Sequence, residues 1–191
     1  QGGKTLHNYY YFLRQLSRSL EGILGRAVIS ECFSQSREEL IVRFEIREGS
    51  YYIKASLLPG FACLSFPDNF SRARKNSVDL FPGIIGQRVS AIRQFNNERR
   101  FAIELSNHFS LLFKMHGNRS NILLFENDNV QSVFKNSIVA DTQTKLSALD
   151  RNIDWSFENF KLNRDRLPEI YFTFGKVVWQ YMELMGFSQK P

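Results

Sequence analysis

The sequence predicts an α+β protein in which a β-sandwich carries an N-terminal helix and is followed by a C-terminal helical appendage. Three observations predict it: helical apolar spacing over residues 6–24, short alternating segments between residues 40 and 134, and a return to helical spacing after residue 141. The composition, 43% hydrophobic and 23% charged over 191 residues, is typical of a globular chain that can bury a core without disulfides. We expect a sandwich domain at 6–140 and a helical region at 141–191.

Residues 6–24 are expected to form an amphipathic helix that covers a sheet. Their apolar side chains recur three and four positions apart, which places them in one stripe along a helix. These side chains are Tyr9, Phe12, Leu13, Leu16, Leu20, Ile23 and Leu24. Gly25 follows the stripe and is expected to end the helix.

The middle of the chain is expected to form seven or eight short strands. In the first of them Leu40, Val42, Phe44 and Ile46 occupy alternate positions, the spacing of one strand face. Turn residues such as Glu48-Gly49-Ser50 separate neighbouring strands. The expected strands are 40–46, 51–57, 61–66, 88–95, 99–105, 109–115, 120–125 and 130–134; brief helical segments are expected at 78–85 and 154–160, and a longer helix at 167–185.

The sequence lacks motifs for catalysis or for a cofactor. It contains no Gly-x-Ser-x-Gly elbow and no glycine fingerprint for a dinucleotide. Cys32 and Cys63 lack CxxC spacing and the three histidines are scattered, so we expect no metal site. We therefore expect a binding module rather than an enzyme, with no cofactor and no small-molecule substrate.

The location of the protein is also indicated by its sequence. No apolar run reaches the roughly 20 residues that span a bilayer, and no export signal is recognisable at the start. Two cysteines that are expected to be buried and reduced fit a reducing compartment. We expect a cytoplasmic protein without a membrane partner.

The net charge of +6 arises mostly from one part of the chain. Between Asp68 and Arg119 there are nine basic residues and four acidic ones, which accounts for +5. Such a local excess either solubilises a surface or forms the footprint of a polyanionic partner.

Two motifs carry a resemblance to a known family. Residues 113–125 read FKMHGNRSNILLF, where a glycine, a basic residue, a serine before Asn121 and an Ile-Leu-rich strand follow one another. Residues 93–105 read RQFNNERRFAIEL, a strand, a turn, the acidic-arginine pair Glu98-Arg99 and a second strand. With the opening helix and residues 32–35, these motifs resemble the N-terminal domain of the NFACT family, also called RqcH-like or fibronectin-binding protein A-like, over most of residues 6–135.

The resemblance implies a β-sandwich similar to the N-terminal domain of formamidopyrimidine-DNA glycosylase, followed by the start of a helix-hairpin-helix segment of a longer protein. It also implies a module that binds tRNA and the large ribosomal subunit when stalled ribosomes are rescued. The glycosylases use an N-terminal proline amine, and this chain has Leu6-His7-Asn8 in that place, so base excision by that mechanism is not supported. The chain departs from the family at residues 72–83, where basic residues replace a double proline.

The resemblance and the basic excess together predict the RNA-binding residues. Arg99, oriented by Glu98, is expected to be the central tRNA contact, because a guanidinium presents a fixed fork to phosphates. Asn121 is expected to hold a turn more than to touch RNA. The supporting phosphate contacts are expected to be Arg72, Arg74, Lys75, Arg93, Lys114 and Arg119, and the cluster is expected to share one positive face.

Two other functions stay open from the sequence. The older family name favours an adhesin module that binds fibronectin or another extracellular matrix protein, and the missing export signal argues against it. A glycosylase-like enzyme that processes nucleic acid is the third possibility, and the missing nucleophile argues against that.

Overall fold

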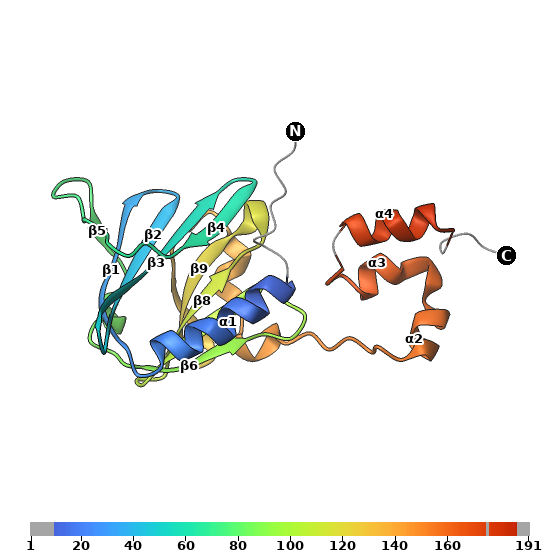
Figure 1. The fold of residues 1–191 in the computed structure, drawn as a ribbon, viewed down its shortest axis with the longest axis horizontal. Helices are drawn as coiled ribbons and strands as arrows, with labels where there is room; N and C mark the ends of the chain where they lie inside the picture. Colours follow the sequence, from blue (N-terminus) through green and yellow to red (C-terminus); the bar gives the residue numbers. More distant parts are fainter. Residues whose placement is uncertain (1–9, 175, 187–191) are drawn as a thin grey trace.

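The computed structural model describes residues 10–174 and 176–186, and its chain folds into two five-stranded antiparallel sheets with helices at both ends (Figure 1). The first sheet has the strand order β4-β3-β2-β1-β5 and the second the order β10-β9-β8-β7-β6. Helix α1 (Tyr10–Leu24) lies across the sandwich and contacts β6, β7 and β2. The α+β class predicted from the sequence is confirmed.

Both sheets are meanders in which most neighbouring strands are joined by tight turns. The β2–β3 turn is Arg47-Glu48, because Ile46 pairs with Gly49, and the β9–β10 turn is Asn127-Asp128, because Glu126 pairs with Asn129. The first sheet comprises β1 (Val28–Ser36), β2 (Glu39–Ile46), β3 (Gly49–Leu58), β4 (Phe61–Ser65) and β5 (Val78–Asp79). The second comprises β6 (Val89–Gln94), β7 (Arg100–Leu105), β8 (Phe109–Lys114), β9 (Asn121–Glu126) and β10 (Asn129–Val133).

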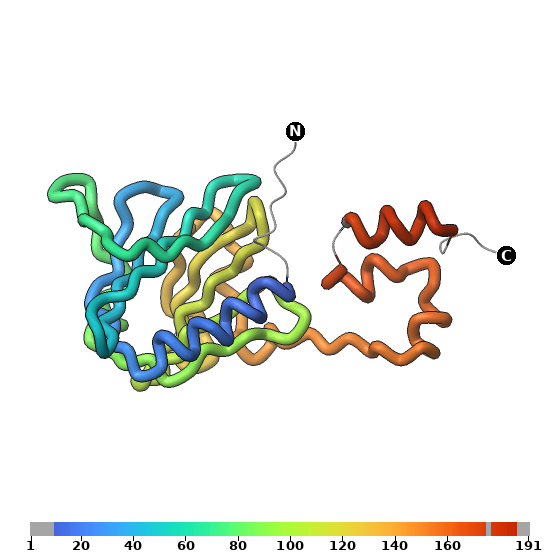
Figure 2. Tube along the Cα trace, in the orientation of Figure 1, coloured from blue at the N-terminus to red at the C-terminus, as the bar shows by residue number. Residues whose placement is uncertain are grey.

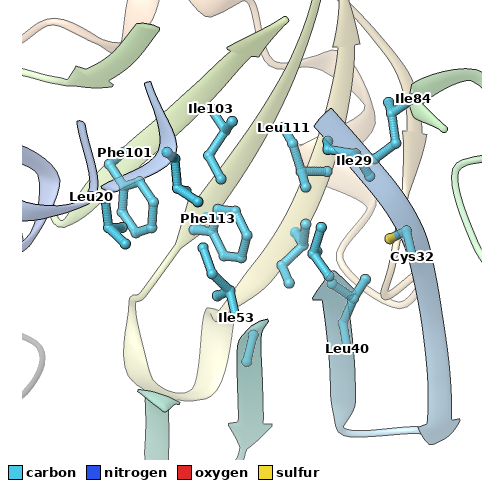
Figure 3. Close-up of a cluster of buried hydrophobic side chains, with 14 of the residues drawn as sticks. Leu20, Ile29, Cys32, Leu40, Ile53, Ile84, Phe101, Ile103, Leu111 and Phe113 are labelled. Carbon is cyan, nitrogen blue, oxygen red and sulfur yellow. The ribbon is translucent and has the colours of Figure 1, made fainter. Parts of the chain in front are cut away.

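The main core lies between the two sheets, and α1 contributes to it. Figure 3 shows Leu20 of α1 beside Phe101 and Phe113 of the second sheet, with Ile53 of the first sheet opposite them. The rings of Phe101 and Phe113 stack with centroids 4.9 Å apart. Non-directional burial of this apolar surface is the main source of stability for such a sandwich.

The outer face of each sheet is covered as well. On the second sheet Leu146 and Leu149 pack against Phe95, Leu112 and Phe125, so the chain stays on the sandwich as far as residue 149. On the first sheet Phe70, in the long connection between β4 and β5, packs against Phe33, Ile41 and Tyr52. Burial on both faces explains why β8 and β9 read as continuous apolar runs and not as alternating ones.

The sequence-based elements differ from the structure at residues 78–85. The expected brief helix is the two-residue strand β5 followed by the 3-10 helix η2 (Pro82–Ile84). The Leu80 amide donates to the Cys32 carbonyl oxygen at 2.9 Å, which extends the pairing of β5 with β1. Phe81 has a φ of 50°, a left-handed conformation that a helix does not accommodate.

The C-terminal region is helical, as expected, but its helices are shorter. They are α2 (Phe157–Leu162), α3 (Leu167–Ile170) and α4 (Lys176–Leu184), so the continuous helix expected over 167–185 is wrong. Helix α3 ends just before Tyr171, whose ring packs on Trp155 and Phe160. The Tyr171 hydroxyl donates a hydrogen bond to the Asp154 carbonyl oxygen. Tertiary packing of Tyr171 therefore competes with helix propensity. The predicted division into domains at residue 140 stays a prediction.

No helix within the described residues is long and apolar enough to cross a membrane.

The position of α1 on the core can be tested with two truncations on the same helix. Leu20 is fully buried, whereas Ile23 is 42% exposed. We expect Leu20→Ala to lower the free energy of unfolding by about 2–5 kcal/mol through the lost contacts and the cavity left behind. The control Ile23→Ala is expected to cost less than about 1 kcal/mol. Urea denaturation followed by circular dichroism measures both, and equal losses would contradict the packing of α1.

Candidate functional site

The β6–β7 turn is held in one conformation from several sides. Asn97 has a φ of 58°, a left-handed conformation that asparagine tolerates better than most residues. The Gln94 side-chain amide donates to the Glu98 carbonyl oxygen at 2.9 Å, and Ser17 of α1 donates to the Gln94 side-chain oxygen at 3.0 Å. Helix α1 therefore helps to position the turn.

The turn places the Glu98 carboxylate among three basic side chains. Glu98 is only 4% exposed. Its oxygens lie 3.2 Å from Arg100 Nε, 3.6 Å from His116 Nε2 and 3.5 Å from Arg151 Nε. A buried carboxylate is costly unless it is paired, and here Arg100 of strand β7 and Arg151 of the segment after residue 149 supply the charged partners, while the neutral His116 lies beside them.

The expected orientation of Arg99 by Glu98 is wrong. Glu98 pairs with Arg100, and it forms no ion pair with Arg99 within the described part of the chain. Arg99 is exposed, whereas Glu98 and Arg100, on either side of it, contact each other. Arg99 is thus a guanidinium available to a partner.

His116 lies in a strongly positive environment. Its Nε2 accepts a hydrogen bond from Arg100 Nε at 3.3 Å, which requires the neutral imidazole at that nitrogen. Burial, followed by the charges of Arg100, Arg99, Lys114 and Arg119, lowers the pKa of His116 to about 3. The potential that disfavours a proton on His116 also favours an anionic group nearby.

The segment after residue 149 is fastened to the same turn. Asp150 accepts from Arg93 at 2.9 Å and from the Asn96 amide at 2.9 Å. The Arg151 amide donates to the Asn96 carbonyl oxygen at 3.2 Å. Arg93, expected as a phosphate contact, is therefore engaged in holding the chain as it leaves the sandwich.

A cleft of about 490 Å³ opens beside the turn, between the sandwich and the helical region. The Arg151 guanidinium lies 4.1 Å from the ring centroid of Phe172 at its rim. The Thr173 hydroxyl oxygen is buried there and has no hydrogen-bond partner among the described residues. Lining residues are Tyr10, Asn97, Glu98, Arg99, His116, Arg151, Glu169, Phe172, Thr173 and Phe174.

The cleft offers charged and aromatic side chains to a partner. Arg99 and Arg151 can fork onto carboxylate or phosphate oxygens, and Tyr10, Phe172 and Phe174 offer ring surfaces. No group of His, Cys, Asp and Glu in the described ranges has the arrangement of a metal site.

Lys114 and Asn121 lie beneath the surface near the cleft. Lys114 Nζ is 2.6 Å from Asp141 Oδ1, and Asn121 donates to Asp141 Oδ2 at 2.8 Å. The Asn121 side-chain oxygen accepts from the amides of Ile122 and Lys135. These two residues therefore connect β8 and β9 to the segment after β10, and Lys114, at 8% exposed, does not present its charge to solvent.

The remaining expected contacts divide between two places. Arg119, in the 3-10 helix η3 (Gly117–Arg119), is exposed and lies close enough to affect His116. Arg72, Arg74 and Lys75 lie in the β4–β5 connection, which Figure 2 shows at the opposite end of the sandwich from the β6–β7 turn. The expectation of one shared positive face is therefore wrong, because the strand order separates these segments.

Sequence reasoning missed four residues of the site. Arg100 stands next to the expected Glu98-Arg99 pair, but Glu98 lies in a bend outside the strand, so strand alternation does not indicate their contact. His116, Arg151 and Phe172 reach the turn only through the strand pairing and through the path of the chain after residue 149, and no local pattern indicates that.

The fold is shared with solved structures of bacterial binding proteins. It matches the N-terminal domain of fibronectin-binding protein PavA from Streptococcus pneumoniae with a TM-score of 0.66, at 15% identity over 95% of this chain and 83% of the other. The N-terminal part of a fibronectin/fibrinogen-binding protein from Streptococcus suis matches with a TM-score of 0.61, at 18% identity over 85% and 68%. A fibrinogen-binding protein from Staphylococcus aureus matches with 0.58, at 15% identity over 78% and 57%.

These matches support the fibronectin-binding protein A-like part of the resemblance at the level of fold. The link to RqcH-like proteins stays a prediction. No protein-family model matches the sequence, and no curated protein matches it either.

The burial of Glu98 can be tested by removing its charge. Glu98→Gln leaves Arg100 and Arg151 without their carboxylate, so we expect the free energy of unfolding to fall by about 3–5 kcal/mol. The control Glu104→Gln, on β7 and without an ion pair to a described residue, is expected to change it by about 0.5 kcal/mol or less. Guanidinium titrations compare the two, and a small effect of Glu98→Gln would show that Glu98 is solvated.

The low pKa of His116 makes stability depend on pH. Above its unfolded value of 6.5 the neutral form is present in both states, and as the pH falls toward 3 only the unfolded chain takes up the proton. Stability attributable to His116 should fall by about 2 kcal/mol between pH 7 and pH 5.

Replacement of His116 by glutamine isolates that contribution. His116→Gln keeps an acceptor for Arg100 and does not titrate, so its stability should change less over this range than that of the unsubstituted chain. His108→Asn, which removes the exposed histidine of the β7–β8 turn, is the control and should keep the dependence. Identical pH profiles for the chain and His116→Gln would contradict the low pKa.

Proposed function

We propose that this chain is a non-catalytic binding module whose partner is a matrix protein of the fibronectin or fibrinogen class. The observation that carries the proposal is the shared fold: a fibronectin-binding protein's N-terminal domain matches over 95% of this chain. Two further matches are named for binding fibrinogen or fibronectin. The absence of catalytic motifs from the sequence agrees with a binding role.

The contact surface of the proposed module is the cleft beside the β6–β7 turn. Protein interfaces concentrate binding energy in a few buried arginine and aromatic residues. The cleft has both, with Arg99 exposed at one wall and Arg151 stacked on Phe172 at another. An acidic side chain of the partner would pair with Arg99, and its apolar neighbours would pack on Phe172 and Tyr10.

RNA is the second candidate partner, and one observation favours it. Four basic residues lie close enough to His116 to lower its pKa, which is the electrostatic environment that phosphates seek. In this alternative the chain is a cytoplasmic module that binds tRNA and the large ribosomal subunit during rescue of stalled ribosomes. Glu98 then acts by placing Arg100, and Arg99 and Arg119 contact phosphates.

Binding measurements on the same variants separate the two partners. We expect the chain to bind immobilised fibronectin or fibrinogen, and Arg99→Gln to weaken that binding about tenfold, the loss expected when one interface anchor is removed. Arg47→Gln, an exposed arginine in the β2–β3 turn, removes the same charge away from the cleft and should change affinity less than about twofold. Surface plasmon resonance measures each affinity.

A parallel titration with tRNA decides the alternative. If tRNA binds with a binding constant that falls steeply with salt, by about 0.7–0.9 logarithmic units per phosphate contact, and Arg99→Gln reduces it while neither matrix protein binds, the RNA function replaces the proposed one. If neither class of partner binds, both functions are wrong for the isolated chain.

A further inference from the structure

One end of the first sheet gathers four short segments, of which only η3 enters the binding described above, through Arg119 in the RNA alternative. Because β1, β2, β3 and β4 alternate in direction, the β1–β2 turn and the β3–β4 turn emerge at the same end. Figure 2 shows the tip of the β4–β5 connection pointing to the same side as these two turns. The 3-10 helix η3 contacts both β3 and β4 and completes the group. We call this group of segments the loop end.

The loop end exposes an apolar pair at its outermost turn. Leu58 and Phe61 pair across the β3–β4 turn, and each is 47% exposed. Pro59 and Gly60 between them are exposed too, and neither carries a polar side chain. Two large apolar side chains directed outward from one hairpin tip are available to an apolar environment above it.

The loop end also carries four basic side chains, in three segments other than the β3–β4 turn. Arg37 lies in the β1–β2 turn, Arg74 and Lys75 lie in the β4–β5 connection, and Arg119 lies in η3; all four are exposed. None of them forms an ion pair with another residue that the structure describes. Of the nearby carboxylates, Glu38 pairs with Lys135 and Asp79 with Arg72, while Asp68 of the β4–β5 connection forms no ion pair with a described residue, so four unpaired cations stand against one unpaired carboxylate. The free charge of the loop end is therefore positive.

The β4–β5 connection holds its basic tip in place. Arg72 donates to the Ser77 hydroxyl at 2.6 Å, pairs with Asp79 at 2.7 Å and lies 4.5 Å from the ring centroid of Phe33. The Ala73 amide donates to the Gln35 side-chain oxygen at 2.6 Å. Little ordering is therefore needed before Arg74 and Lys75 meet a partner, which favours binding.

We propose that the loop end binds the surface of an anionic lipid membrane, with Leu58 and Phe61 inserted at the level of the headgroups. Basic residues near an anionic bilayer and apolar side chains at its interface reinforce each other, and either signal alone gives weak binding. RNA fits the surface less well, because its phosphates would pair with the four cations but leave the apolar pair in water. No membrane partner was expected from the sequence. The residues of the loop end are far apart in the sequence, and only the folded sheet brings their segments to one end.

This inference is independent of the proposed function. Leu58, Phe61, Arg37, Arg74 and Lys75 do not line the cleft beside the β6–β7 turn, whereas Arg119 lies close enough to His116 of the cleft to affect its pKa. Replacement of Leu58, Phe61, Arg74 and Lys75 therefore changes no residue that lines the cleft.

Vesicle co-sedimentation of the full chain tests the proposal. The probes are vesicles of phosphatidylcholine and vesicles that contain about 30% phosphatidylglycerol, and we expect binding only to the second. Each basic residue near the bilayer contributes about fivefold to the affinity, so Arg74→Gln with Lys75→Gln should weaken binding about 25-fold. Leu58→Ser with Phe61→Ser should weaken it at least tenfold, because interfacial insertion is lost.

Matched variants keep the result interpretable. Arg14→Gln with Arg18→Gln removes the same charge from exposed positions of α1 and should change vesicle binding less than twofold. Circular dichroism confirms that each variant is folded. Equal losses in the α1 control would show non-specific attraction, and no effect of the Leu58 and Phe61 changes would assign the loop end to a soluble polyanion such as RNA. Either outcome, or absence of vesicle binding, overturns the proposal.

Discussion

The burial of one carboxylate, Glu98, is the constraint on which the arrangement of the site depends. A carboxylate at 4% exposure cannot remain charged in an apolar interior without partners. Its charged partners come from two parts of the chain: Arg100 on β7 and Arg151 after the sandwich. The same group therefore links the turn, the start of β7 and the segment through which the chain leaves toward the helical region.

Although Glu98 is paired with basic side chains, the surface around the β6–β7 turn keeps unpaired positive charge. Arg100 is matched by Glu98, and Lys114 by Asp141, but Arg99 and Arg119 stay exposed nearby. Burial, followed by the positive charges of Arg100, Arg99, Lys114 and Arg119, disfavours a proton on His116 and lowers its pKa. Internal pairs thus make the site rigid, and the unmatched guanidinium of Arg99 gives it a charge to offer a partner.

The sequence predicts those elements of the fold that have a regular spacing of apolar residues. Alternation in β2 and continuous apolar runs in β8 and β9 predict strands, and the spacing in α1 predicts a helix. The break between α3 and α4 was not accessible, because it depends on Tyr171 packing against Trp155 and Phe160. The helix predicted for residues 78–85 was wrong for a similar reason, because the pairing of β5 with β1 outweighs the local apolar spacing of these residues.

The sequence predicted the candidate site only in part. Charge counting located Glu98 and Arg99 in a basic stretch, and the resemblance paired them, whereas the bend at the end of the β6–β7 turn brings Glu98 to Arg100. Charge counting also merged Arg72, Arg74 and Lys75 with the turn, although the order of strands places them at another end. Net charge carries no information about which segments the sheets bring together.

The central claim, that Glu98 acts through Arg100 and not through Arg99, is tested most directly by two double-mutant cycles. One combines Glu98→Gln with Arg100→Gln and the other combines Glu98→Gln with Arg99→Gln, each measured by denaturant unfolding. The buried contact predicts a coupling energy of about 2 kcal/mol for Glu98 with Arg100, and about 0.3 kcal/mol or less for Glu98 with Arg99. A larger coupling with Arg99 than with Arg100 would contradict the account.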